Sequence, residues 1–87
     1  MDLSIIIPCF NEEKTIKTII EKIFNLEIIK FELIIVNDGS TDKTEERIKE
    51  TIFFDRIKYL KHERNLGKGA AIITAKKFIS GHSNATT

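Results

Sequence analysis

Apolar residues form two short runs, at residues 3–7 and 33–36, in which Ser4 is the one polar residue, and each run ends abruptly in polar residues. Runs without polar alternation are typical of strands that are buried on both faces of a parallel sheet. A third strand is expected at residues 56–60. Between the runs, apolar residues recur three and four positions apart, a spacing that predicts helices. The clearest helix is marked by Ile16, Ile19, Ile20, Ile23 and Phe24.

Polar residues at the end of each run can start the helix that follows. Asn11 can cap the first helix through its side-chain oxygen. Glu12 and Glu13 are expected in the first turn of that helix, where the helix dipole favours negative charge. Thr41 or Asp42 can cap the second helix in the same way. Both strands are therefore expected to lead into capped helices.

The second helix is expected to extend to about Ile52, with a thin apolar side formed by Ile48 and Ile52, and with Phe53 as a further candidate. A third helix is expected to begin near residues 67–69 and to run to Ile79, where Gly81 ends it. Its alanines leave a flat apolar side that permits close approach to a sheet. The two phenylalanines at 53–54 are expected at the core or its rim.

The order of elements is β-α-β-α-β-α, which is typical of an α/β protein with a parallel sheet. Crossovers between parallel strands are almost always right-handed, so we expect half of a doubly wound, Rossmann-like fold with a three-stranded sheet in the order 3-2-1. The first strand then lies at an edge, with Ser4 as its one polar position. An open apolar edge invites pairing with another chain.

Size and charge exclude several classes of protein. The chain has 87 residues, which leaves room for one domain, and its formal net charge of +1 gives no field that would attract nucleic acid. It begins without a secretory signal and has no apolar stretch of the roughly 20 residues that cross a bilayer. We therefore expect a cytoplasmic protein, and a position at the cytoplasmic face of a membrane stays open. Cys9 is the single cysteine, which excludes an internal disulfide and favours a packing role.

The candidate site lies just beyond the carboxyl ends of the strands, where open α/β sheets bind ligands. Glu12 and Asp38 follow the first two strands and should face one crevice, and the turn at residues 67–69 follows the third. This turn matches neither the Rossmann nor the phosphate-loop glycine motif. Carboxylates at the strand ends suit the hydroxyls and ring N–H groups of a nucleoside, while Lys68 suits its phosphates.

Each of these residues also has a purely structural interpretation. Asp38 can belong to a turn that reverses the chain, and Glu12 can serve only the helix dipole. Lys68 can be a solvated loop charge. Neither His62 nor His82 has partners that would imply a metal. A basic cluster can steer phosphate but is more typical of an exposed strand end, and it comprises Lys58, Lys61, His62, Arg64 and Lys68.

Three sequence blocks, in this order and spacing, resemble the opening of family-2 glycosyltransferases. The blocks are SIIIPCFNE at 4–12, IIVNDGSTDKT at 34–44 and NLGKGA at 65–70. Within the family, the spacing is most similar to the polyprenyl phosphate sugar transferases, which use dolichyl or undecaprenyl carriers. The resemblance implies a GT-A fold that binds a UDP- or GDP-linked sugar. It also implies transfer of the sugar to an acceptor such as a polyprenyl phosphate, with a Mg or Mn ion as cofactor.

The resemblance implies nucleotide-binding roles for six residues, which are Pro8, Phe10, Glu12, Val36, Asp38 and Lys68. The family's metal-binding D-x-D pair, acceptor loop and general base match no position here, so no catalytic or metal-binding residue is assigned. We therefore expect residues 1–81 to be the nucleotide-sugar-binding N-terminal part of a truncated transferase, with negligible activity of its own. Residues 82–87 are expected to form a loose tail.

A second hypothesis is a non-catalytic relic or interaction module that pairs through its open sheet edge, either with itself or with a complementing chain. Binding of UDP or GDP would favour the transferase hypothesis over this one. The base, the sugar and the acceptor are set by residues that this sequence does not contain.

Overall fold

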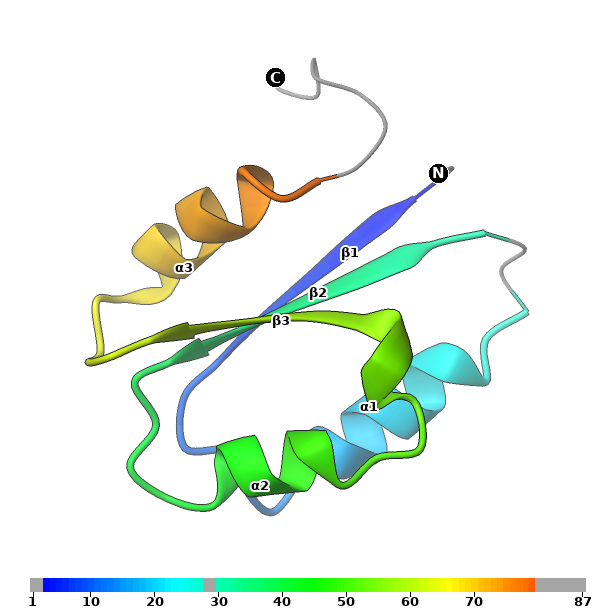
Figure 1. Ribbon diagram of the computed structural model, residues 1–87, viewed down its shortest axis with the longest axis horizontal. Helices are drawn as coiled ribbons and strands as arrows, with labels where there is room; N and C mark the ends of the chain where they lie inside the picture. Colours follow the sequence, from blue (N-terminus) through cyan, green and yellow to red (C-terminus); the bar gives the residue numbers. More distant parts are fainter. Residues whose placement is uncertain (1–2, 28–29, 80–87) are drawn as a thin grey trace.

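The computed structural model describes residues 3–27 and 30–79. Three parallel strands form one sheet in the order β1-β2-β3 (Figure 1). The strands are β1 Ser4–Cys9, β2 Glu32–Asp38 and β3 Ile57–His62. The helices are α1 Ile16–Phe24, α2 Thr44–Lys49, the 3-10 helix η1 Phe54–Arg56 and α3 Lys68–Lys76. The predicted α/β class, order of elements and order of strands are confirmed.

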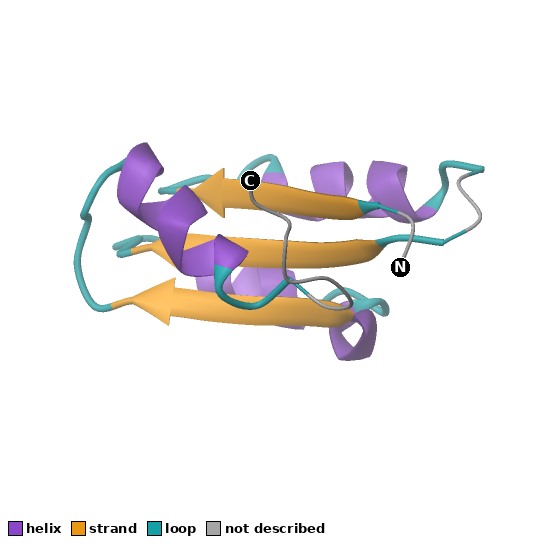
Figure 2. Cartoon of the chain, turned by 90° about the horizontal axis from the view of Figure 1, so that it is seen from above, coloured by secondary structure: helices purple, strands orange, loops and turns teal. Residues whose placement is uncertain are grey.

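The central strand β2 is buried along its whole length, between β1 and β3. Its Leu33 and Ile35 belong to the core that α1 and α2 cover, whereas Ile34 and Val36 pack against α3. Figures 1 and 2 show α1 and α2 on one face of the sheet and α3 on the other. The sheet is therefore the middle of three layers, which explains why the second apolar run shows no alternation.

The helices contact the sheet through different kinds of side chain. Ile16 and Ile20 of α1 are fully buried. On the opposite face, α3 buries Ala71 and Ala75, whose short side chains let the helix backbone approach the sheet closely. The expected flat alanine side of the third helix is confirmed.

The helix α2 is shorter than the sequence predicts, because it ends at Lys49 rather than near Ile52. The amide of Thr51 then donates to the carbonyl of Ile48 as the chain turns toward η1. Ile52 is 90% exposed, so its expected place on the apolar side of the helix is wrong.

The segment after α2 covers one end of the core with aromatic rings. Phe53 stacks on Phe24 with ring centroids 4.5 Å apart, and Phe54 meets Tyr59 edge-on at 6.0 Å. Both phenylalanines are partly buried against the core, as predicted. The strand β3 begins one residue later than expected, because Arg56 ends η1.

The third helix ends at Lys76, and a turn continues the chain to Ile79. In this turn the amides of Phe78 and Ile79 donate to the carbonyls of Ala75 and Lys76. The predicted stop at Gly81 and the predicted tail at 82–87 lie outside the described residues.

The strand β1 lies at the edge of the described sheet, as expected, and pairs there with β2. Ile5, Ile6 and Ile7 are only partly buried, so apolar surface remains along this edge. Among the described residues, no helix is both long enough and apolar enough to cross a membrane.

We expect Ile20→Ala to lower the free energy of unfolding by about 2–5 kcal/mol, because it opens a cavity in a fully packed core. Ile52→Ala is the matched control and should change it by less than about 0.5 kcal/mol, because that side chain is solvated. Urea unfolding followed by circular dichroism measures both. Equal losses in the two variants would contradict the assigned core.

Candidate nucleotide site

The carboxylate of Asp38, at the end of β2, organises the rim where the carboxyl ends of the strands meet. Asp38 is 3% exposed. Its Oδ1 accepts hydrogen bonds from the Leu66 amide at 2.9 Å and from Nδ1 of His62 at 2.7 Å. Its Oδ2 accepts one from the Gly67 amide at 2.9 Å. The side chain at the end of β2 therefore holds the loop that joins β3 to α3.

The hydrogen bonds keep this buried carboxylate charged. Burial alone would raise the pKa of Asp38, but the hydrogen bonds from the Leu66 amide, the His62 ring and the Gly67 amide outweigh burial and lower it. The group is therefore ionised at neutral pH.

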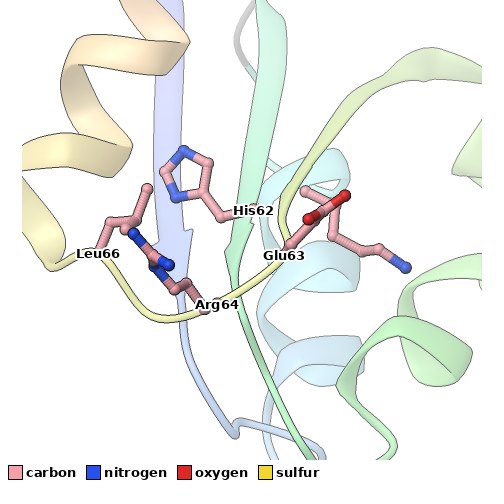
Figure 3. A pocket seen from close by; sticks show the side chains of 5 residues that line it. His62, Glu63, Arg64 and Leu66 are labelled. Carbon is pink, nitrogen blue, oxygen red and sulfur yellow. The ribbon is translucent and has the colours of Figure 1, made fainter.

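His62 continues the contact toward α3. Its Nε2 lies 2.8 Å from the hydroxyl oxygen of Thr74, and its side chain is 10% exposed. In Figure 3 the His62 ring points toward α3, while Glu63 points to the other side of the loop. Placing His62 in an exposed basic cluster was therefore wrong. Register explains the contact, because Asp38 and His62 are paired residues of adjacent strands.

The loop after β1 is tied to the loop after β2 by Asn11. Oδ1 of Asn11 accepts the amide of Thr41 at 2.8 Å, and the Asn11 amide donates to Oγ of Ser40 at 2.9 Å. Asn11 has a φ of 53°, a left-handed conformation that asparagine tolerates better than most residues. Its predicted role as a helix cap is wrong, because α1 begins at Ile16. The side chain bridges two loops instead.

Two further contacts continue this bridge toward the helices. The amide of Glu12 donates to Oγ1 of Thr44 at 2.8 Å, and the amide of Lys43 donates to Oε1 of Glu13 at 2.9 Å. Glu12 and Glu13 precede α1, so the prediction that they lie in its first turn is wrong. The backbone carbonyl of Glu12 instead accepts the amide of Ile16 at 2.9 Å.

Asp42 serves the start of α2 in the manner expected of a capping side chain. Its Oδ1 accepts the amide of Thr44, the first residue of α2, at 2.9 Å, although the N-cap position itself is Lys43. Burial would raise the pKa of Asp42, but hydrogen bonds led by the Thr44 hydroxyl lower it. Its Oδ2 also accepts the Glu13 amide at 3.3 Å, so Asp42 belongs to the same bridge.

Gly39 allows the loops after β2 and β3 to touch. A Cβ atom built on Gly39 would lie 2.2 Å from the carbonyl carbon of Arg64 and 2.4 Å from the backbone nitrogen of Asn65. The residue also has a φ of 75°, which favours glycine. No other side chain fits here without moving the neighbouring loop.

The loops after β1, β2 and β3 border an open cavity of about 290 Å³ at the rim. It is lined by Pro8, Cys9, Phe10, Glu12, Asp38, Asn65, Gly67 and Lys68. The structure thus brings together all the residues expected to contact a nucleotide except one. The exception is Val36, whose side chain is fully buried under α3.

A second, open cavity of about 620 Å³ adjoins the loop after β3 and is the one drawn in Figure 3. Its lining comprises Lys61, His62, Glu63, Arg64 and Leu66. Nζ of Lys61 lies 2.7 Å from Oε1 of Glu45. Hydrogen bonds from Lys49 and Lys61 lower the pKa of Glu45 to about 2. This part of the predicted basic cluster is therefore engaged in ion pairing.

Cys9 borders the cavity but belongs to the core. It is a free thiol, 4% exposed. Burial, and after it the nearby Glu12 carboxylate, raise the pKa of Cys9 to about 12, so the thiol is neutral. The predicted packing role is confirmed.

Residues 3–27 and 30–79 contain no group of three or more His, Cys, Asp or Glu side chains placed to hold a metal ion. These residues do not fit the Mg or Mn ion implied by the family resemblance, and no chemical step is assigned through one.

The sequence alone does not indicate the bridging contacts of Asn11 and Thr44 between the loops, nor the contact of Thr74 with His62. Their partners lie far away along the chain, as for Asn11 and Thr41. The only signal available was the pairing of strand ends, which places Asp38 opposite His62 once the register is known.

We expect Gly39→Ala to lower the free energy of unfolding by about 2 kcal/mol or more, because it adds a clash to a left-handed backbone. Gly69→Ala is the control, since it lies in α3 with open space around it. It should raise the free energy of unfolding by about 0.5–1 kcal/mol. Changes of the same sign in urea unfolding would contradict this geometry.

The lowered pKa of Asp38 predicts a loss of stability in acid. In the unfolded chain the pKa is near the usual 3.8, so the stabilisation is complete above that pH and disappears as pH falls through the lower folded value. The free energy of unfolding should therefore fall below about pH 4. Asp38→Asn should flatten this fall without abolishing it, because Asp42 and Glu45 also have lowered pKa values. If the free energy of unfolding of Asp38→Asn falls with pH as steeply as that of the wild type between pH 5 and about pH 2, Asp38 does not have a lowered pKa.

Comparison with known proteins identifies the family. The model of the glycosyl transferase family 2 matches residues 4–82. A poly-beta-1,6-N-acetyl-D-glucosamine synthase of Staphylococcus epidermidis is 36% identical over 70 residues, which are 80% of this chain and 17% of that protein. A dolichyl-phosphate beta-glucosyltransferase of Trichomonas vaginalis is 37% identical over 82 residues, covering 80% of this chain and 24% of the relative.

A solved structure shares the fold. It is the mannosyltransferase PcManGT of Pyrobaculum calidifontis in complex with GDP-Man and Mn²⁺, with a TM-score of 0.82 and 24% identity over 91% of this chain and 24% of that one. This likeness supports the predicted GT-A class of fold. The chain thus spans about a quarter or less of the length of these proteins. It belongs to glycosyl transferase family 2, in which it corresponds to the N-terminal part of the family domain.

Proposed function

We propose that this chain is the nucleotide-sugar-binding portion of a family-2 glycosyltransferase and that it takes a UDP- or GDP-linked sugar. The observation that carries the proposal is the cavity at the strand ends, where a buried carboxylate, an aromatic ring and a lysine converge. A concave site with a few convergent polar groups is the usual form of a small-molecule site.

The cavity offers a different kind of group to each part of a nucleotide. The ionised carboxylate of Asp38 can accept hydrogen bonds from a ring N–H or a ribose hydroxyl. Phe10 is 42% exposed, and its ring can pack against a base. Lys68 is the first residue of α3, so its ammonium and the helix N-terminus can both attract a diphosphate. Glu12 borders the cavity, and its carboxylate can accept a hydrogen bond from a ribose hydroxyl.

Two residues from the resemblance have indirect roles in this proposal. The ring of Pro8 lines the cavity beside Cys9 and shapes its wall. Val36 is paired with Pro8 in the sheet and does not line the cavity, so it supports the site from below.

The acceptor that we propose is a polyprenyl phosphate. It is supported by the spacing of the three sequence blocks and by relatives whose names include a dolichyl phosphate. The relative named for poly-beta-1,6-N-acetyl-D-glucosamine synthesis matches the same segment, so this segment does not by itself fix the acceptor class. The catalytic step is likewise not assigned to any residue described here.

We expect the chain to bind UDP or GDP and Lys68→Ala to weaken the binding about tenfold, because the variant loses a charge-assisted contact with phosphate. Lys76→Ala, at the exposed far end of the same helix, is the matched control and should bind as the wild type does. Asp38→Ala should abolish binding. Isothermal titration calorimetry at one fixed ionic strength measures all four proteins.

The proposal fails if the wild-type chain binds neither nucleotide. It also fails if Lys68→Ala and Lys76→Ala weaken binding equally, since that result would reflect a general effect of charge rather than a site.

A further inference from the structure

A carboxylate, an imidazole and a hydroxyl from three different elements form a continuous row of hydrogen-bonded side chains. Oδ1 of Asp38 is 2.7 Å from Nδ1 of His62, and Nε2 of the same ring is 2.8 Å from Oγ1 of Thr74. The Asp38 and His62 side chains are 5% and 10% exposed. The last residue of β2, the last residue of β3 and a residue in the last turn of α3 are thus joined through one buried ring.

The chemistry of the groups fixes how this ring is protonated. An ionised carboxylate can only accept, so Nδ1 of His62 must carry a proton and donate it to Asp38. The hydroxyl of Thr74 can either donate to Nε2 or accept from it. The contact with Asp38 therefore persists whether the imidazole is neutral or charged.

The Asp38, His62 and Thr74 side chains are not arranged to attack a substrate. Thr74 lines neither of the two cavities described above, so its hydroxyl does not face a nucleotide bound at the proposed site. His62 lines the larger cavity but not the one that holds Lys68. Any effect of His62 on a nucleotide must act through Asp38.

We propose that His62 is a positioning residue that orients the Asp38 carboxylate and thereby holds the β3–α3 loop in its binding conformation. Oδ1 of Asp38 accepts hydrogen bonds from the His62 ring and from the Leu66 backbone amide. Oδ2 is therefore left to accept the hydrogen bond from the Gly67 amide at the cavity wall. Without the hydrogen bond from the His62 ring the carboxylate can rotate, and the loop that leads into Lys68 loses its anchor. The part of this inference that concerns a nucleotide rests on the proposed function.

Two substitutions separate the two ring nitrogens. His62→Asn places an amide group near the position of Nδ1 and can still donate to Asp38, whereas His62→Gln places it near Nε2 and can reach only Thr74. We expect His62→Gln to weaken UDP or GDP binding about tenfold, and His62→Asn to stay within about twofold of the wild type. Thr74→Val is the control that keeps the Asp38 contact, and it should lower the melting temperature without changing affinity.

A second measurement needs no ligand. Hydrogen exchange of the Leu66 and Gly67 amides in the whole chain should be faster in His62→Gln than in His62→Asn or Thr74→Val. The carboxyl carbon of Asp38, followed by NMR, should titrate at a higher pH in His62→Gln, since the carboxylate has lost a donor.

These measurements distinguish failure of the inference from failure of the proposed function. If the wild type binds no nucleotide but the exchange pattern holds, the positioning role stands and the proposed function falls. If His62→Gln and His62→Asn have the same effects on affinity and exchange, the ring contributes only packing and the inference is wrong. It is equally wrong if both variants match the wild type in exchange and titration.

Discussion

The buried charge of Asp38 is the constraint on which the rim of the sheet depends. Burying an unpartnered carboxylate costs on the order of several kcal/mol, so the fold must supply donors wherever this side chain goes. It supplies two backbone amides from one loop and a ring proton from the adjacent strand. The path of the β3–α3 loop is therefore set by the central strand, and Gly39 provides the space in which that loop can pass.

Hydrogen bonds between side-chain oxygens and backbone amides also join the loop after β1 to the loop after β2. Asn11, Asp42 and Thr44 direct their oxygens across the rim to backbone amides of the neighbouring loop. In α1 this replaces a side-chain cap, because Thr15 at its N-cap position makes no capping hydrogen bond. Hydrogen bonds between loops thus take the place of a helix cap. They fix the relative positions of segments that lie about 30 residues apart along the chain.

How much the sequence could predict follows from the range of the interactions. The strands, their order and the alanine face of α3 depend on the spacing and apolar character of neighbouring residues, which can be recognised in the sequence itself. The end of α2 was misjudged because Ile52 continues the helical spacing, yet the chain turns there so that Phe53 stacks on Phe24 and Phe54 packs against Tyr59. The roles of Asn11 and His62 were misjudged because their partners are set by tertiary contacts, which no local pattern contains.

The candidate site combines a buried, hydrogen-bonded floor with exposed contact groups, and this division suits the binding of a flexible ligand. Asp38, His62 and Gly39 are held by burial, hydrogen bonds or close backbone contact, so they lose little freedom when a ligand arrives. Phe10 and Lys68 lie at exposed positions and can adjust. Preorganised polar groups reduce the entropic cost of binding, whereas adjustable ones tolerate variation in the ligand. In the proposed function, this floor lies under the nucleoside, while the exposed Phe10 and Lys68 side chains adjust to the base and to the diphosphate.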